Sequence, residues 1–307
     1  MSDYSKSAGV TICKTTVAAD EDEDDVKPID WPSLSTMLSP DIFAALHGHL
    51  IGNESDDSPR EPATGPIAAE SCIELSSNVK PTPNNAVFKE HSYWEERFTD
   101  EEEYDWLLTY EQLQTHLIPL LEVTEKILIV GCGNSRLSAC LYDAGFTNIT
   151  NIDFSDIVIK KMKLLHGEVR PLMKWIFMDM TDLQFEHSSF DVVIDKASMD
   201  ALMVDEGDVW HPNQLTIDIT DRMCLGVSKV LATNKGGRFI QLSFAQPHFR
   251  TKYLMGQYIN ENLDSISIIS PFESTVGFCA RYQWTLSFST IDTEAGCLNS
   301  FLYVMKS

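Results

Sequence analysis

The sequence predicts an α/β fold in which an open, mostly parallel sheet carries helices on both faces. Apolar stretches of strand length alternate with helical stretches from residue 126 to residue 203. The first of these strands ends in the glycine turn Gly131-Cys132-Gly133, and the next three each end in an acidic residue. Because ligands of such sheets bind beyond the carboxyl ends of the strands, the same pattern predicts a ligand-binding edge.

The glycine turn is the centre of this prediction. The run Ile127–Val130 before it is typical of a strand buried on both faces. Gly131 and Gly133 allow a sharp turn and a close approach of the backbone to a ligand. Arg136 stands where a dinucleotide fingerprint has its third glycine, which disfavours nicotinamide and flavin cofactors.

The acidic strand ends favour S-adenosylmethionine over NAD. Asp153 follows the second strand, 148–152, about twenty residues after the turn, where a carboxylate can accept hydrogen bonds from both ribose hydroxyls. A helix cap or an ion pair is its alternative role. Asp179 and Met180 follow the third strand, 175–178, and should bracket an adenine, with a solvated strand end as the alternative.

The remaining pattern completes a seven-stranded sheet. The fourth strand, 190–194, is followed by Asp195 and Lys196. The other predicted strands are 238–244, 282–288 and 300–305, and the last two form an antiparallel hairpin. The predicted helices are 91–98, 107–121, 136–144 capped by Asn134 or Ser135, 156–165 capped by Ser155, 197–203 and 214–231, with a loop at 204–212 and a turn at 247–250. This is a Rossmann-like layout, that of a class I methyltransferase.

Three aromatic residues, Trp94, Phe98 and Trp106, precede the first strand. They either pack in the core beneath a helix at the edge of the sheet or cover a bound cofactor. The second role is chemically suitable because the faces of aromatic rings attract a sulfonium cation. The residues themselves leave both roles open.

Composition restricts the partners. With 46 acidic and 23 basic residues the formal net charge is −23, which argues against direct binding of nucleic acid or an anionic membrane. It favours a basic partner or simply solubility. The seven cysteines form no CxxC pair and no zinc-site spacing, so no metal is expected. Since no signal peptide or long apolar run is recognised, we expect a cytoplasmic protein. We also expect a monomer.

The chain divides at about residue 86. Residues 1–86 are rich in acidic residues, serine and proline, and are predicted to be a disordered extension. Within it, residues 41–50 have apolar residues at helical spacing and could form a short docking helix or only a transient one. Residues 87–307 have the composition of a globular domain and are predicted to form the methyltransferase domain.

Several strings of residues resemble the lysine methyltransferases of translation elongation factor 1-alpha, especially their type 4 branch. They are Tyr93-Trp94-Glu95-Glu96-Arg97-Phe98, Tyr104-Asp105-Trp106, Gly131-Cys132-Gly133-Asn134-Ser135, Asn151-Ile152-Asp153-Phe154-Ser155, Met178-Asp179-Met180 and the run 190–202. The cofactor contacts that the resemblance implies are Trp94, Phe98, Trp106, Gly131, Asp153, Phe154, Asp179, Met180 and Lys196. Phe98 stands where the family has tyrosine, and Ala197 where it tends to have glycine.

The resemblance implies an S-adenosylmethionine-dependent protein-lysine N-methyltransferase whose basic partner is elongation factor 1-alpha. Lys196 should face the region of methyl transfer, with an ion pair to Asp195 or Asp200 as the alternative. Asp195 and Asp200 are the candidates for orienting the acceptor nitrogen. A methyltransferase for a small molecule and a non-catalytic scaffold that binds S-adenosylmethionine remain the alternative functions.

Overall fold

The computed structural model describes residues 85–233, 236–259, 275–292 and 299–307. The predicted extension up to residue 84, with the possible helix at 41–50, lies outside these residues. No helix of the described part is long and apolar enough to cross a membrane.

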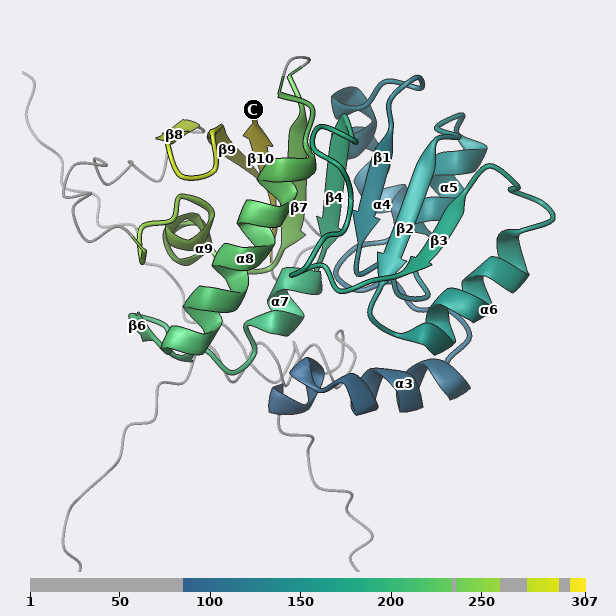
Figure 1. Ribbon diagram of the computed structural model, residues 1–307, viewed down its shortest axis with the longest axis horizontal. Helices are drawn as coiled ribbons and strands as arrows, with labels where there is room; N and C mark the ends of the chain where they lie inside the picture. The colour runs from purple at the N-terminus through teal and green to yellow at the C-terminus, as the bar shows by residue number, and fades with distance from the viewer. Residues whose placement is uncertain (1–84, 234–235, 260–274, 293–298) are drawn as a thin grey trace, which may run out of the picture.

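An eight-stranded sheet forms the middle layer, with the strand order β3-β2-β1-β4-β7-β10-β9-β8 (Figure 1). The strands are β1 (Ile127–Val130), β2 (Ile149–Asp153), β3 (Lys174–Phe177), β4 (Val192–Lys196), β7 (Arg238–Ser243), β8 (Thr275–Cys279), β9 (Trp284–Ile291) and β10 (Ser300–Lys306). The neighbours from β3 to β7 are parallel, whereas β10 is antiparallel to both β7 and β9. The direction of winding reverses between β1 and β4, which is where such sheets bind ligands.

Helices cover both faces of the sheet. They are α3 (His91–Asp100), α4 (Tyr110–Leu117), α5 (Leu137–Asp143), α6 (Asp156–His166), α7 (Ser198–Leu202), α8 (Gln214–Val230) and α9 (Pro247–Leu254). Short 3-10 helices lie at η1 (Asn85–Lys89) and η2 (Ile118–Leu120), and β5 (Gly207–Asp208) pairs with β6 (His211–Pro212).

The alternation along β1 explains how the sheet is buried. Ile127 and Ile129 belong to the core cluster that contains α4, α5 and α6, while Leu128 and Val130 belong to the cluster beneath α8. All four side chains are at most 3% exposed. Because successive side chains of a strand point to opposite faces, an uninterrupted apolar run is what a doubly covered strand requires, and this prediction is confirmed.

Two predictions need correction. The predicted strand count of seven is wrong, because β8 adds an eighth strand at the edge, paired antiparallel with β9. Its run contains Gly277, at φ +132° beside an irregularity in the register, which weakens the strand signal in the sequence. The predicted turn at 247–250 continues as helix α9 through Leu254, with a proline in its first turn.

The outer hairpin is held to α8 by a buried carboxylate. Asp221 of α8 accepts hydrogen bonds from Arg281 at 2.5 Å and from the Tyr282 hydroxyl at 2.7 Å, both in the turn between β8 and β9. Tyr282 is only 1% exposed, so its hydroxyl depends on this acceptor.

We expect Asp221→Ala to lower the free energy of unfolding by about 2–4 kcal/mol, because it leaves a buried hydroxyl and a guanidinium without their partner. Urea unfolding followed by circular dichroism measures the change. Asp218→Ala, one turn earlier on the exposed side of the same helix, is the matched control and should change the value by less than about 0.5 kcal/mol. Equal effects of the two variants would contradict the anchoring role.

Candidate active site

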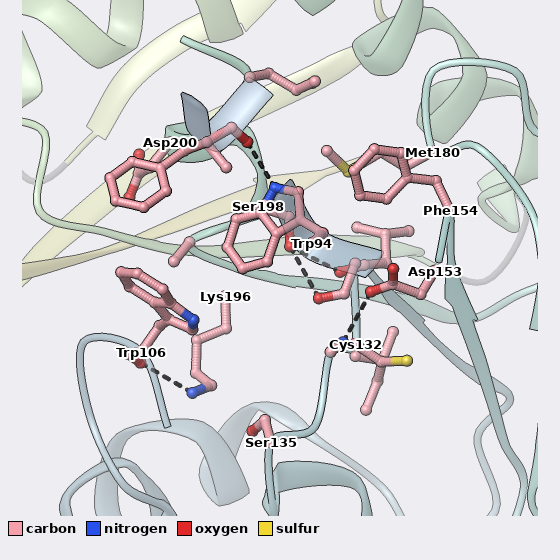
Figure 2. A pocket seen from close by; sticks show the side chains of 18 of the residues that line it. Trp94, Trp106, Cys132, Ser135, Asp153, Phe154, Met180, Lys196, Ser198 and Asp200 are labelled. Atoms are coloured by element: carbon pink, nitrogen blue, oxygen red, sulfur yellow. Dashed lines mark hydrogen bonds between the residues drawn. The ribbon is translucent and has the colours of Figure 1, made fainter. Parts of the chain in front are cut away.

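A cavity opens at the carboxyl ends of β1, β2 and β4 and is bounded by residues of α3, α7 and the segment 104–107 (Figure 2). The structure brings together at this cavity every residue for which the sequence predicted cofactor contact. They are Trp94, Phe98, Trp106, Gly131, Gly133, Asp153, Phe154, Asp179, Met180 and Lys196.

The glycine turn after β1 packs against the start of α7. Gly131 and Gly133 have φ values of +56° and +50°, which favour glycine. A Cβ atom on Gly131 would lie 2.2 Å from Oγ of Ser198, whereas one on Gly133 would meet only Phe98, at 3.5 Å. Oγ of Ser198 bonds the carbonyl oxygens of Val130 and Gly131, each at 3.1 Å. Residue 131 therefore has to be glycine for the turn after β1 to pack against the first turn of α7.

Asp153 connects this turn to the next helix. Its Oδ2 accepts a hydrogen bond from the Gly133 N–H at 2.9 Å, and its Oδ1 accepts one from the Ser155 N–H at 2.9 Å. Burial raises the pKa of Asp153 to about 6, although these hydrogen bonds oppose the rise. A carboxylate has about four acceptor positions, so it can still bind a pair of hydroxyls. The predicted cap of α6 is confirmed, because Oγ of Ser155 accepts from the Val158 N–H at 3.2 Å.

Asp179 and Met180 follow β3 on the same side of the cavity. Asp179 is exposed and its Oδ1 accepts a hydrogen bond from the Thr181 N–H at 2.7 Å, which shapes the turn. The sulfur of Met180 lies 3.8 Å from the position that a Cβ on Gly131 would take. The Phe154 ring meets His91 of α3 edge-on at 5.2 Å. These contacts place the ends of β2 and β3 beside the glycine turn.

The aromatic residues form one wall of the cavity and also belong to the core. Trp94 and Phe98 stack at 5.5 Å and are 9% and 3% exposed, and Trp106 meets Trp94 edge-on at 5.8 Å. Nε1 of Trp94 donates to the Phe88 carbonyl at 2.6 Å. The two roles that the sequence left open are thus compatible, since the same rings pack in the core and line the cavity.

Lys196 has a different partner from the two that the sequence suggested. Its Nζ donates to Oδ1 of Asp105 at 3.0 Å and to the carbonyl oxygens of Trp106 and Leu108 at 2.9 and 3.4 Å. Burial lowers the pKa of this ammonium. Asp105, which also accepts a hydrogen bond from Ser135 at 2.5 Å, lies in a motif that the sequence analysis noted without giving this residue a role.

Asp195 does not have the position expected of a residue at the mouth of the site. It is fully buried and is not among the residues that line the cavity. It accepts hydrogen bonds from the Ser198 N–H and the Gln241 side chain, each at 2.8 Å, and so holds the start of α7. Burial raises its pKa to about 6.

Asp200 does line the cavity, and one of its oxygens is unpaired among the described residues. Its Oδ1 accepts from the Ser243 hydroxyl at 2.6 Å and forms a buried ion pair with Arg250. Its Oδ2 is buried and has no hydrogen-bond partner among the described residues. Leaving a buried acceptor unsatisfied is costly, so this oxygen is suited to accept from a ligand. Ser243 and Arg250 lie 43 and 50 residues further along the chain, so no local sequence pattern links them to Asp200.

Comparison with known proteins gives related methyltransferases. The family described as a methyltransferase domain matches residues 128–207. EEF1A lysine methyltransferase 4 of Bos taurus is 36% identical over 186 residues, which cover 59% of this chain and 72% of that protein. The eEF1A lysine and N-terminal methyltransferase of Mus musculus is 41% identical over 167 residues. The matched residues cover 54% of this chain but only 23% of that larger relative.

Solved structures with a similar arrangement are more distant. N-methyltransferase NodS from Bradyrhizobium japonicum is 12% identical, with a TM-score of 0.45, and the match covers 73% of this chain and 99% of that one. Phosphoethanolamine N-methyltransferase 1 of Haemonchus contortus is 13% identical, with a TM-score of 0.46, and the match covers 73% of this chain and 49% of that one.

We expect Gly131→Ala to destabilise the protein by about 2 kcal/mol more than Gly133→Ala does. Both variants put a side chain at positive φ, but only the first also collides with Ser198. Thermal unfolding of the two variants measures the difference. Adding Ser198→Gly to Gly131→Ala should recover part of the loss, and equal melting temperatures for the two single variants would show that the collision is relieved elsewhere.

Proposed function

Because the chain belongs to the family of EEF1A lysine methyltransferase 4, we propose that it transfers a methyl group from S-adenosylmethionine to a lysine side chain of translation elongation factor 1-alpha. The observation that carries the proposal is the meeting of the glycine turn, Asp153 and Asp200 at one cavity, with one buried oxygen of Asp200 left unpaired among the described residues. When bound, S-adenosylmethionine supplies a methyl group activated by its sulfonium charge.

The residues at the cavity fit this cofactor. Asp153 accepts hydrogen bonds from the ribose hydroxyls, since its two backbone bonds leave acceptor capacity at the end of β2. Asp179 and Met180 contact the adenine, and Phe154 packs beside it. Gly131 and Gly133 let the backbone approach the cofactor. The wall of Trp94, Phe98 and Trp106 presents aromatic rings, which attract a cation.

Asp200 orients the acceptor amine. A lysine must lose a proton before its nitrogen can attack, and an ordinary lysine has a pKa near 10.4. An isolated carboxylate would oppose this loss, but the charge of Asp200 is balanced by its ion pair with Arg250. Oδ2 of Asp200 can therefore accept an N–H of the neutral amine and direct its lone pair.

Lys196 is a positioning residue in this proposal. Its ammonium holds the segment that carries Trp106, so it keeps the aromatic wall in place and does not contact the acceptor. Asp195 supports Asp200 indirectly by fixing the first turn of α7. Neither side chain is proposed as the group that removes the proton from the substrate.

Two further features agree with a protein-lysine substrate. The chain at the end of β4 reads Asp195-Lys196-Ala197-Ser198 and lacks the Asn/Asp-Pro-Pro-aromatic sequence typical of methyltransferases that act on planar amides or adenine. The net charge of −23 complements a basic protein. A cytoplasmic location belongs to the same proposal, because a translation elongation factor works there.

A lysate assay with tritiated S-adenosylmethionine tests the function. We expect the enzyme to label one protein band, which mass spectrometry identifies as elongation factor 1-alpha methylated on lysine. Asp200→Asn should lower kcat about 10- to 100-fold, because the activation free energy rises by roughly 1.4–3 kcal/mol when the amine is no longer oriented. The same variant should leave the cofactor Kd within about twofold. Asp218→Asn, on the exposed side of α8, is the matched control and should retain full activity.

The alternatives give other results in the same assay. Label only in small molecules would favour a small-molecule methyltransferase. Cofactor binding without any label would favour a non-catalytic scaffold. Full activity of Asp200→Asn on the elongation factor would remove the orienting role from Asp200 and leave the enzyme assignment intact.

We expect cofactor affinity to fall as the pH drops below about 6, by up to about tenfold per pH unit, because protonated Asp153 loses its charge and one acceptor. Asp153→Asn should weaken binding about 10- to 100-fold at neutral pH and be nearly insensitive to pH between about 5 and 7.5. Calorimetry measures both effects, with Asp156→Asn as the control. A variant that keeps the wild-type affinity would contradict the assignment.

A further inference from the structure

Helix α6 packs beside the edge strand β3 at one end of the sheet (Figure 1). Leu164, Leu165, Val169, Leu172 and Phe177 are between 58% and 86% exposed, and all five lie on α6, on β3 or on the connection between them. We call these five residues, together with Lys163 of α6 and Lys174 of β3, which are also exposed, the α6–β3 face. Several large exposed apolar side chains on neighbouring elements are typical of contact surfaces.

The edge strand adds a second reason to expect a partner. Among the described residues, β3 pairs with β2 alone and its other side is open. An open strand edge with apolar side chains such as Phe177 invites unwanted pairing, and proteins commonly cover such an edge. The α6–β3 face therefore needs an occupant that supplies apolar groups.

The charge of this region indicates which occupant fits. Residues 156–177, from the start of α6 to the end of β3, contain five basic side chains and two acidic ones, a net charge of +3 in a chain whose net charge is −23. Lys160 and Arg170 pair with Asp156 and Asp143, whereas Lys163 and Lys174 are exposed. A basic protein such as the proposed methyl acceptor does not complement this surface, but an acidic segment with apolar residues does.

We propose that the N-terminal segment of this chain, residues 1–84, binds the α6–β3 face. The segment has 15 acidic and 5 basic residues, a net charge of −10, and six of its acidic residues are consecutive, Asp20–Asp25. Residues 41–50 supply Ile42, Phe43, Leu46 and Leu50 as apolar partners. The proposal is independent of the methyl-transfer function.

The connection of the segment places it within reach. It joins the described structure at η1, which leads directly into α3, and α3 packs against α6. Nζ of Lys161 on α6 bonds the carbonyl oxygens of Phe98 and Glu101 at the end of α3, at 3.3 and 2.6 Å. A random-coil linker of 35 residues, the number that separates residue 50 from residue 85, has a root-mean-square span of roughly 30–35 Å. Such a linker gives the tethered segment an effective concentration on the order of millimolar at the face, so even a weak contact keeps the face occupied.

Zero-length carbodiimide cross-linking of the full chain, which joins a carboxylate to an amine in contact with it, tests the proposal. We expect cross-links from residues 20–25 to Lys163 or Lys174 within one chain, lost at high salt because the contact is partly electrostatic. Lys229 on α8 and Lys306 on β10 are equally exposed controls and should react at least about tenfold less.

Paired variants separate the face from the segment. Leu164→Ser with Phe177→Ser should reduce the cross-links at least about fivefold, whereas Leu215→Ser with Leu225→Ser, on exposed positions of α8, should not. Thermal unfolding confirms that both double variants are folded.

Three results would overturn the proposal. One is similar cross-linking to Lys229 and Lys306, and another is the absence of cross-links from residues 20–25 to any lysine. The third is cross-linking between differently isotope-labelled chains, which would show that the α6–β3 face joins two copies.

Discussion

The buried carboxylate of Asp153 is the contact on which the site depends. It lies at the end of β2 and binds the backbone N–H of Gly133 on one side and of Ser155 on the other. One side chain therefore fixes both the glycine turn after β1 and the start of α6. Burying a charge is unfavourable, as the raised pKa of Asp153 shows, and the two backbone donors offset part of that cost. The same carboxylate is then available to a ligand in a fixed position.

Much of the fold could be predicted because its signals are local. The apolar run of β1, the glycine turn and the capping serine of α6 each depend on residues close in sequence. β8 was missed since its run is short and interrupted by Gly277. The partners of Lys196 and Asp200 were missed for another reason: Asp105 and Arg250 lie 91 and 50 residues away, and only the folded chain brings them together.

The position of Asp195 away from the cavity has a geometric cause. Asp195 and Lys196 are consecutive in β4, and consecutive side chains of a strand point to opposite faces. Lys196 reaches the segment 104–108 on one face, so Asp195 faces Gln241 and the first turn of α7 on the other. The two adjacent side chains therefore contact different parts of the structure, and only Lys196 lines the cavity. Asp200 reaches the cavity because α7 carries it back across the ends of the strands.

The three hydrogen bonds of Lys196 protect this lysine from methylation by the cofactor that the enzyme binds. A catalyst that holds an electrophilic methyl donor beside one of its own primary amines risks alkylating itself. The ammonium of Lys196 has three N–H bonds, and Asp105, Trp106 and Leu108 each accept one of them. While all three are engaged, the nitrogen has no free electron pair. A resident lysine can thus line the chamber without competing with the incoming one.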